Sequence, residues 1–83
     1  MKLLYFAWVR ERIGTSSEDV ARPDGVNTVG ELIGWLAGRG GGYGEAFADQ
    51  AHVRAAVNQS HVDMAHPVND EDEIAFFPPV TGG

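Results

Sequence analysis

The residues with the clearest chemical potential stand at the end of the chain, in the run Pro78-Pro79-Val80-Thr81-Gly82-Gly83. The two prolines lack amide donors and favour an extended backbone, so they would hold this segment away from a folded body. The next two residues also prefer extended backbone. The final two are glycines without side chains, so the terminal carboxylate could enter a narrow channel. We therefore expect the main-chain carboxyl of Gly83 to be the reactive group.

A terminal carboxylate is a poor electrophile, and adenylation by ATP would supply the leaving group that it lacks. A sulfur donor could then displace AMP and leave a C-terminal thiocarboxylate, whose sulfur is a strong nucleophile. The chain contains no cysteine, which excludes disulfides, zinc–thiolate sites and thiol nucleophiles. Any sulfur that the chain carries would therefore be attached to its terminal carboxyl. The alternative interpretation of a Gly-Gly end is an ordinary frayed terminus.

Size and composition indicate one small globular domain. The chain has 83 residues, of which 43% are hydrophobic and 22% charged, as in ordinary folded proteins. The formal net charge of −6 argues against nucleic acid as a ligand. It fits a partner with a basic docking face, or solubility alone. No apolar run approaches the roughly 20 residues of a membrane span, and the N-terminus lacks a signal-peptide cleavage site. We expect a cytoplasmic protein without membrane contact.

No metal or cofactor site is predicted in the chain itself. The three histidines, His52, His61 and His66, are unevenly spaced and lack a ligand pattern. The acidic stretch at residues 69–73 lacks the spacing and glycine of a calcium loop. The glycine-rich stretch at residues 39–44 lacks the lysine and the glycine spacing of phosphate-binding loops. We interpret it as a flexible connection.

A main helix is predicted from residue 29 to Gly38. Thr28 and Glu31 have the spacing of a capping box at its start. Apolar residues then recur at i, i+3, i+4 and i+7 on one helical face, as Val29, Leu32, Ile33 and Leu36. One further helical turn is expected at residues 45–49.

Strands are predicted at residues 2–9, 18–21, 53–58, 61–64 and 73–77. The first is apolar on both faces, which is typical of a central strand. Residues 10–14 are expected to form a turn in which Gly14 takes positive φ, and residues 58–60 another turn. This order of elements predicts an α+β fold, a ubiquitin-like β-grasp with one main helix across one face of a mixed sheet. Its first and last strands would run parallel at the centre. Residues 1–77 would form the β-grasp domain and residues 78–83 an extended tail.

Several runs along the chain carry a resemblance to a known family. They are Tyr5-Phe6-Ala7, Val9-Arg10-Glu11, Gly14-Thr15, Ala55-Ala56-Val57-Asn58-Gln59, His66-Pro67, Asp72-Glu73 and Ala75-Phe76-Phe77-Pro78-Pro79-Val80-Thr81-Gly82-Gly83. With them the chain resembles the small, sulfur-carrier subunit of molybdopterin synthase over nearly its whole length. The last run is the most specific, because a general ubiquitin-like carrier shares only the Gly-Gly.

The resemblance implies a sequence of reactions at Gly83. An adenylyltransferase similar to the ubiquitin-activating class would use ATP to adenylate its carboxyl, which is then converted to the thiocarboxylate. The tail, Pro78, Pro79, Val80, Thr81 and Gly82, would insert into the large subunit of the synthase. There the sulfur would pass to cyclic pyranopterin monophosphate and form the molybdopterin dithiolene. The resemblance also implies a heterotetramer in which the large subunit holds the catalytic side chains, so this chain would be a non-catalytic carrier.

A partner-binding face is proposed for the sheet surface next to the tail. Phe6 and Phe77 would lie together on the face away from the helix and form an apolar patch, although either could instead be a core residue. Arg10, just past the first strand, could pair with an acidic group of the activating enzyme or remain a solvated charge. His61 would belong to this face as well, where the family more often has an apolar residue.

Two alternative functions stay open. Sulfur carriers of thiamine synthesis also end in Gly-Gly, but they are usually shorter and lack the Phe-Phe-Pro-Pro run. Ubiquitin-like protein modifiers share the Gly-Gly end as well and would form isopeptide bonds to lysines. The double proline and the acidic body fit insertion into one fixed partner better than either alternative.

Overall fold

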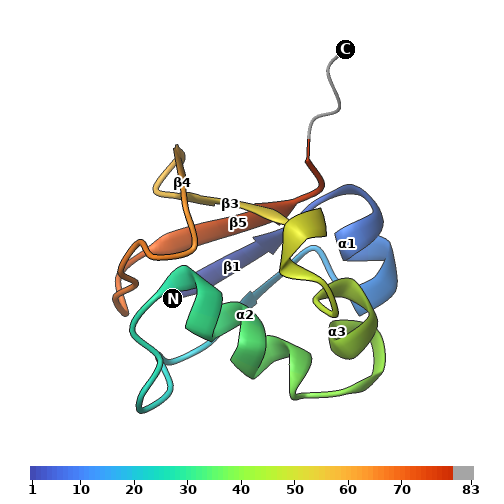
Figure 1. Cartoon of the computed structure of the whole chain (residues 1–83), viewed down its shortest axis with the longest axis horizontal. Coiled ribbons are helices and arrows are strands. Elements are labelled where there is room, and N and C mark those ends of the chain that lie inside the picture. The colour runs from blue at the N-terminus through green and yellow to red at the C-terminus, as the bar shows by residue number, and fades with distance from the viewer. Residues whose placement is uncertain (80–83) are drawn as a thin grey trace.

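The computed structural model describes residues 1–79, which form a five-stranded sheet with helices on one face and at one end (Figure 1). The strand order is β2-β1-β5-β3-β4. The elements in chain order are β1 (Lys2–Tyr5), α1 (Ala7–Ile13), β2 (Ser17–Asp19), α2 (Val29–Ala37), α3 (Gly41–Ala46), the 3₁₀ helix η1 (Gln50–His52), β3 (Arg54–Val57), β4 (Ser60–Val62) and β5 (Glu73–Phe77).

The first and last strands lie side by side and parallel, as predicted. β1 pairs with β5 in the register Tyr5↔Phe76, and β5 pairs antiparallel with β3 on its other side. The outer strands β2 and β4 are antiparallel to their neighbours. The α+β class and the mixed sheet with a main helix are therefore confirmed. This topology places the end of the chain directly after a central strand.

Helix α2 forms as its sequence predicts. The Thr28 side chain accepts a hydrogen bond from the backbone amide of Glu31, and the Glu31 carboxylate accepts one from the amide of Thr28. This reciprocal cap satisfies amides at the helix start that have no partner within the helix. The four predicted apolar residues, Val29, Leu32, Ile33 and Leu36, are all fully buried. They pack against the inward side chains of β1 and β5 to form the core.

The predicted first strand is too long, because β1 ends at Tyr5 and the chain turns into helix α1. Ala7 adopts a left-handed φ of 53° at this turn. Val9 is then fully buried, and Ile13 packs against the core four residues later. Apolar residues at i and i+4 suit a short helix as well as they suit a strand. The predicted turn at residues 10–14 is therefore wrong, although Gly14 ends α1 with the positive φ expected of it, 93°.

The glycine-rich stretch is also more ordered than predicted. Residues 41–46 form α3, and its backbone approaches the last turn of α1. A Cβ atom on Gly42 would overlap the carbonyl oxygen of Arg12 and lie 2.8 Å from the carbonyl carbon. A glycine is therefore required here for close helix contact. The helical turn predicted at residues 45–49 is displaced, since α3 ends at Ala46 and η1 begins at Gln50.

The remaining strands form close to their predicted positions. β5 has the predicted bounds, whereas β2, β3 and β4 are each shorter than expected or shifted by one residue. The turn between β3 and β4 contains Asn58 and Gln59, both with left-handed φ, 50° and 71°. Two consecutive left-handed residues match the right-handed twist of a tight hairpin.

Candidate functional site

The predicted reactive segment begins where the central strand β5 ends. β5 runs to Phe77, and Pro78 and Pro79 follow it, both half-buried. Val80, Thr81, Gly82 and Gly83, which carry the predicted reactive carboxyl and most of the insertion segment, lie outside the described residues. The structure thus defines the root of the tail and the surfaces around it.

Phe6 and Phe77 lie next to each other at the tail root, on the sheet face away from α2. The amide of Phe6 donates to the carbonyl of Phe76 at 3.1 Å, which continues the β1–β5 ladder by one residue. Tyr5 and Phe76, the preceding pair, stack on the buried face with ring centroids 6.1 Å apart. Because neighbouring side chains on extended backbone alternate between faces, the next pair points outward. Phe6 is 48% exposed, so it adds apolar surface that the core does not use.

His61 lies on the same outer face and contacts Phe77. It pairs with Ala56 across β3 and β4, and its imidazole centroid is 5.1 Å from that of the Phe77 ring. The structure therefore brings together three of the four predicted partner-binding residues: Phe6, Phe77 and His61. Whether they bind a partner stays a prediction.

Arg10 occupies a different position from the one predicted. It lies within α1 rather than in a turn after the first strand, because the strand ends at Tyr5. Its side chain is exposed, and it forms no salt bridge within residues 1–79. Its carbonyl accepts the amide of Gly14 at the helix end. The side chain is available to a partner, and whether it binds one stays a prediction.

Arg54 is a charged residue beside this face that the sequence pattern did not reveal. It pairs directly with Phe77 across β3 and β5, and its guanidinium donates to the carbonyls of Ala51 and Val53. The register of β3 against β5 could not be read from either strand alone. An arginine adjacent to partly exposed aromatic side chains is typical of protein-binding surfaces.

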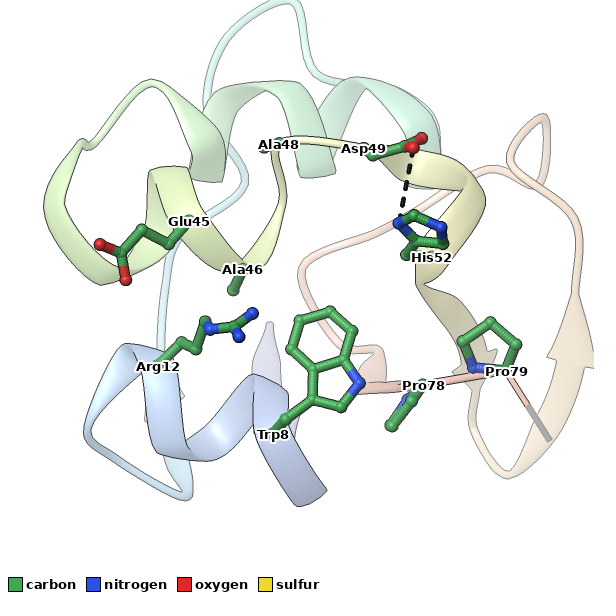
Figure 2. A pocket seen from close by; sticks show the side chains of 9 residues that line it. All are labelled: Trp8, Arg12, Glu45, Ala46, Ala48, Asp49, His52, Pro78 and Pro79. Atoms are coloured by element: carbon green, nitrogen blue, oxygen red, sulfur yellow. Dashed lines mark ion pairs between the residues drawn. The ribbon is translucent and has the colours of Figure 1, made fainter. Parts of the chain in front are cut away.

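A pocket opens on the other side of the tail root, between α1, η1 and the two prolines (Figure 2). Its volume is about 410 Å³. The Trp8 indole extends from α1 toward Pro78 and Pro79 (Figure 2). The Arg12 guanidinium is 5.1 Å from the centroid of the Trp8 ring. The sequence pattern placed Trp8 on a strand, so this pocket was not predicted. The helical turn of α1 is what brings the indole to the tail root.

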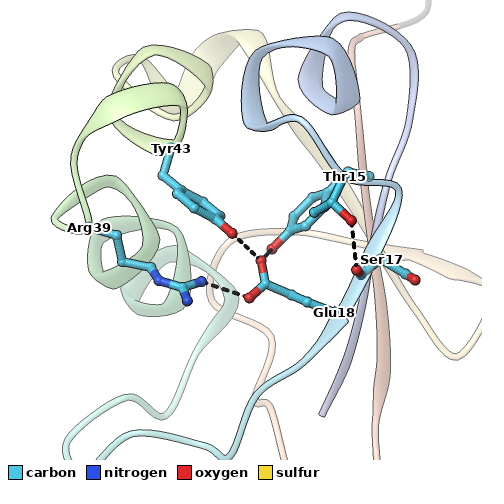
Figure 3. A network of polar contacts seen from close by, with 6 residues as sticks. Thr15, Ser17, Glu18, Arg39 and Tyr43 are labelled. Atoms are coloured by element: carbon cyan, nitrogen blue, oxygen red, sulfur yellow. Dashed lines mark hydrogen bonds and ion pairs between the residues drawn. The ribbon is translucent and has the colours of Figure 1, made fainter.

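Glu18 is the centre of a polar network that joins β2 to α3 (Figure 3). Its carboxylate accepts hydrogen bonds from the hydroxyls of Tyr5 and Tyr43 and pairs with Arg39 at 2.9 Å. Burial raises the pKa of Glu18, but the hydrogen bonds from Tyr43, Arg39 and Tyr5 outweigh it and hold that pKa below its ordinary value. Burial, together with the bond to Glu18, raises the pKa of Tyr5 well above its usual range. The network connects α3 and Arg39, which precedes it in the chain, to the strands β1 and β2.

The described part of the chain contains no group of three or more histidine, cysteine or acidic residues that could hold a metal ion. In the same residues, no helix is long and apolar enough to cross a membrane.

Comparison with known proteins gives consistent matches. The model described as "ThiS family" matches residues 3–83. The chain is 45% identical over 83 residues to the molybdopterin synthase sulfur carrier subunit of Escherichia coli (strain K12), covering 100% of this chain and 99% of that protein. The putative molybdopterin converting factor, subunit 1, from Pyrococcus furiosus superposes with a TM-score of 0.74 at 31% identity, over 95% of each chain. The small archaeal modifier protein 1 of Haloferax volcanii superposes with a TM-score of 0.74 at 26% identity, over 96% of this chain and 97% of that one.

Proposed function

This chain belongs to the ThiS family, and from this membership we propose that it is a sulfur carrier in the biosynthesis of the molybdenum cofactor. It holds sulfur as a thiocarboxylate on the carboxyl of Gly83. Within molybdopterin synthase it donates that sulfur to cyclic pyranopterin monophosphate. The observation that carries the proposal is the 45% identity to a sulfur carrier subunit over the full chain, tail included.

The chemistry follows from the terminal carboxylate. One of its oxygens attacks the α-phosphorus of ATP, pyrophosphate leaves, and an acyl-adenylate forms. A donor of sulfur at the oxidation level of hydrosulfide then attacks the carbonyl carbon, and AMP leaves with the electron pair of the broken C–O bond. The resulting thiocarboxylate sulfur attacks a carbon of the pterin precursor that bears oxygen, and the C–O bond at that carbon breaks, so that the oxygen leaves with the electron pair. Hydrolysis of the acyl–sulfur bond then leaves the sulfur on the precursor and regenerates the carboxylate. Two such transfers supply both sulfurs of the dithiolene.

The tail root supports this division of labour. Pro78 and Pro79 follow a strand that is hydrogen-bonded on both sides, so the tail would leave the body from a rigid base. This chain contributes presentation, while ATP and the catalytic acids and bases belong to its partners. As a small subunit of a synthase, it requires a large subunit. A ubiquitin-activating-like adenylyltransferase would be the second partner, and both would use the face of Phe6, Phe77 and His61.

Intact mass spectrometry tests the proposal directly. The full chain is incubated with an activating enzyme, ATP and a sulfur source, and we expect a mass increase equal to the exchange of one oxygen for sulfur. Fragmentation should place the change on Gly83. Deletion of Gly83 should abolish it while the circular dichroism spectrum stays unchanged. An unaltered mass for the full chain, under conditions that thiolate a known carrier, would rule the proposal out. Rescue of a molybdenum-cofactor mutant, but not of a thiamine mutant, separates the two sulfur pathways.

A second candidate function is protein modification, which the structural similarity to small archaeal modifier protein 1 favours. That protein is 26% identical to this chain, whereas the bacterial sulfur carrier subunit is 45% identical. The carrier function is therefore the better supported. Isopeptide conjugates between Gly83 and lysines in cell extract, dependent on ATP, would establish modification.

A further inference from the structure

The pocket at the tail root is lined mostly by apolar side chains that remain partly exposed. Its apolar lining comes from Trp8, Ala46, Ala48, Pro78 and Pro79. Four of these five side chains keep contact with solvent, and only Ala46 is buried. A volume of about 410 Å³ lies within the usual range for binding pockets, roughly 300–1,000 Å³. The lining is thus an apolar recess of a size that can receive a large side chain.

The pocket and the reactive tail share the same two residues. Pro78 and Pro79 form one wall (Figure 2), and the chain end lies four residues further on. Four residues span at most about 14 Å. A standard protein interface covers roughly 800 Å² on each partner, a disc of about 16 Å radius. A protein that receives the tail up to its root therefore lies within reach of this pocket.

The charges around the pocket specify the chemistry of the incoming group. Glu45 and Asp49 are exposed on its rim. Asp49 lies 3.5 Å from the Nδ1 atom of His52, which also lines the pocket, and Glu45 forms no salt bridge among residues 1–79. Arg12 lies against the Trp8 ring, and the whole chain carries a net charge of −6. A basic residue on the partner would complement this rim, and an apolar side chain beside it would fill the recess.

Resting on the proposed function, we propose that this pocket is a second docking site for the protein that receives the tail. It accepts an apolar side chain, flanked by a lysine or arginine, from a surface loop of that protein. Trp8 with Arg12 forms the recognition pair, since tryptophan and arginine dominate binding energy where they line a desolvated pocket. The site is distinct from the Phe6–Phe77 face, so the partner would contact two separate surfaces at the tail root.

Ala48→Phe is the direct test, because Ala48 is exposed and a phenyl group there would fill the pocket without entering the core. The matched control is Ala21→Phe, an exposed alanine just beyond β2, at the end of the sheet opposite the tail. Both full-length variants are titrated calorimetrically against the large synthase subunit of the same organism. We expect Ala48→Phe to raise Kd by roughly tenfold or more and the control to stay within about twofold.

Glu45→Lys gives an independent measurement that does not depend on filling the pocket. Reversing a rim charge should slow association with the large subunit several-fold and weaken its salt dependence. Thermal unfolding confirms that each variant is folded. Equal affinity of Ala48→Phe and the unchanged chain would overturn the docking site alone. Failure of the unchanged chain to bind the large subunit would overturn the proposed function and the docking site together.

Two other molecules or segments could occupy the pocket, and each would give a different experimental result. Either result would overturn the inference. If a second copy fills the pocket, the unchanged chain dimerises in analytical ultracentrifugation and Ala48→Phe does not. If the chain's own end fills it, removal of residues 80–83 changes Trp8 fluorescence in the isolated chain, measured with Trp35→Phe in the background. The expected result is a monomer whose Trp8 emission responds to the large subunit and not to the truncation.

Discussion

Replacement of Gly42 by alanine should destabilise the fold, although alanine is the better helix former. A Cβ atom at this position would overlap the Arg12 carbonyl oxygen and lie 3.1 Å from the Cα of Ile13. Both neighbouring atoms belong to the backbone of α1, so no side-chain rotation can relieve the contact. Helix α1 must therefore move away from α3. Overpacking of this kind costs about 1–3 kcal/mol. The gain in helix propensity returns at most about 1 kcal/mol. Because both overlapping groups belong to the backbone, the cost should lie at the upper end of that range, and the net loss should be about 2 kcal/mol.

Gly34→Ala is the matched control. Gly34 lies within α2, and a Cβ atom there would meet nothing within 4 Å. The same substitution should therefore stabilise the protein by about 0.5–1 kcal/mol, through propensity and a less flexible unfolded chain. The difference between the two positions that matters here is the space around the new methyl group.

Thermal unfolding followed by far-ultraviolet circular dichroism measures both changes. For a domain of this size, 1 kcal/mol corresponds to a shift in Tm of roughly 4–8 °C. We expect a lower midpoint for Gly42→Ala and a higher one for Gly34→Ala. Since α1 also carries Trp8, Gly42→Ala should in addition change the fluorescence of the Trp8 indole, which lines the pocket at the tail root. A Gly42→Ala protein as stable as the unchanged chain would refute the close approach of α1 and α3.

Three further predictions concern single side chains. Glu18→Gln should cost about 1–3 kcal/mol at neutral pH, because two tyrosine hydroxyls and an arginine lose their charged acceptor. The folded pKa of Glu18 lies below its ordinary value of 4.5. The contribution of Glu18 to the free energy of unfolding is therefore complete above pH 4.5 and is lost as the pH falls through the folded pKa. Urea titrations of the variant at several pH values should lack this part of the acid dependence. Gln59→Gly should stabilise the hairpin by a few tenths to about 1 kcal/mol, because φ is 71° there; a lower Tm would contradict the turn geometry. Phe6→Asp should leave the Tm nearly unchanged, since the ring is 48% exposed, yet weaken large-subunit binding by roughly tenfold or more; unchanged affinity would remove Phe6 from the partner face.

The elements that could be predicted carry their signals locally. The α2 cap and its four apolar residues lie within nine positions of one another, and β5 alternates between buried and half-buried residues along its length. The tail is recognisable for the same reason, because two prolines and two glycines restrict or free the backbone wherever they occur. These features identified the fold class, the family and the candidate carboxyl.

The elements that were missed depend on contacts between distant parts of the chain. Residues 6–9 alternate like a strand, and the packing of Val9 and Ile13 against the core favours a helix instead. The sequence of glycines 40–42 is typical of a flexible loop. In the structure α3 begins there, because Gly42 allows the backbone of α1 to approach closely.

The sequence by itself thus determined which group we propose to carry sulfur, since that proposal depends on local backbone chemistry at the chain end. Only the tertiary structure decided what surrounds the root of the tail. Trp8 reaches Pro78 and Pro79 because α1 turns back after Tyr5, and Arg54 lies beside Phe77 because β3 pairs with β5 in one register. Packing between residues far apart in the chain sets these positions, and no local pattern encodes them.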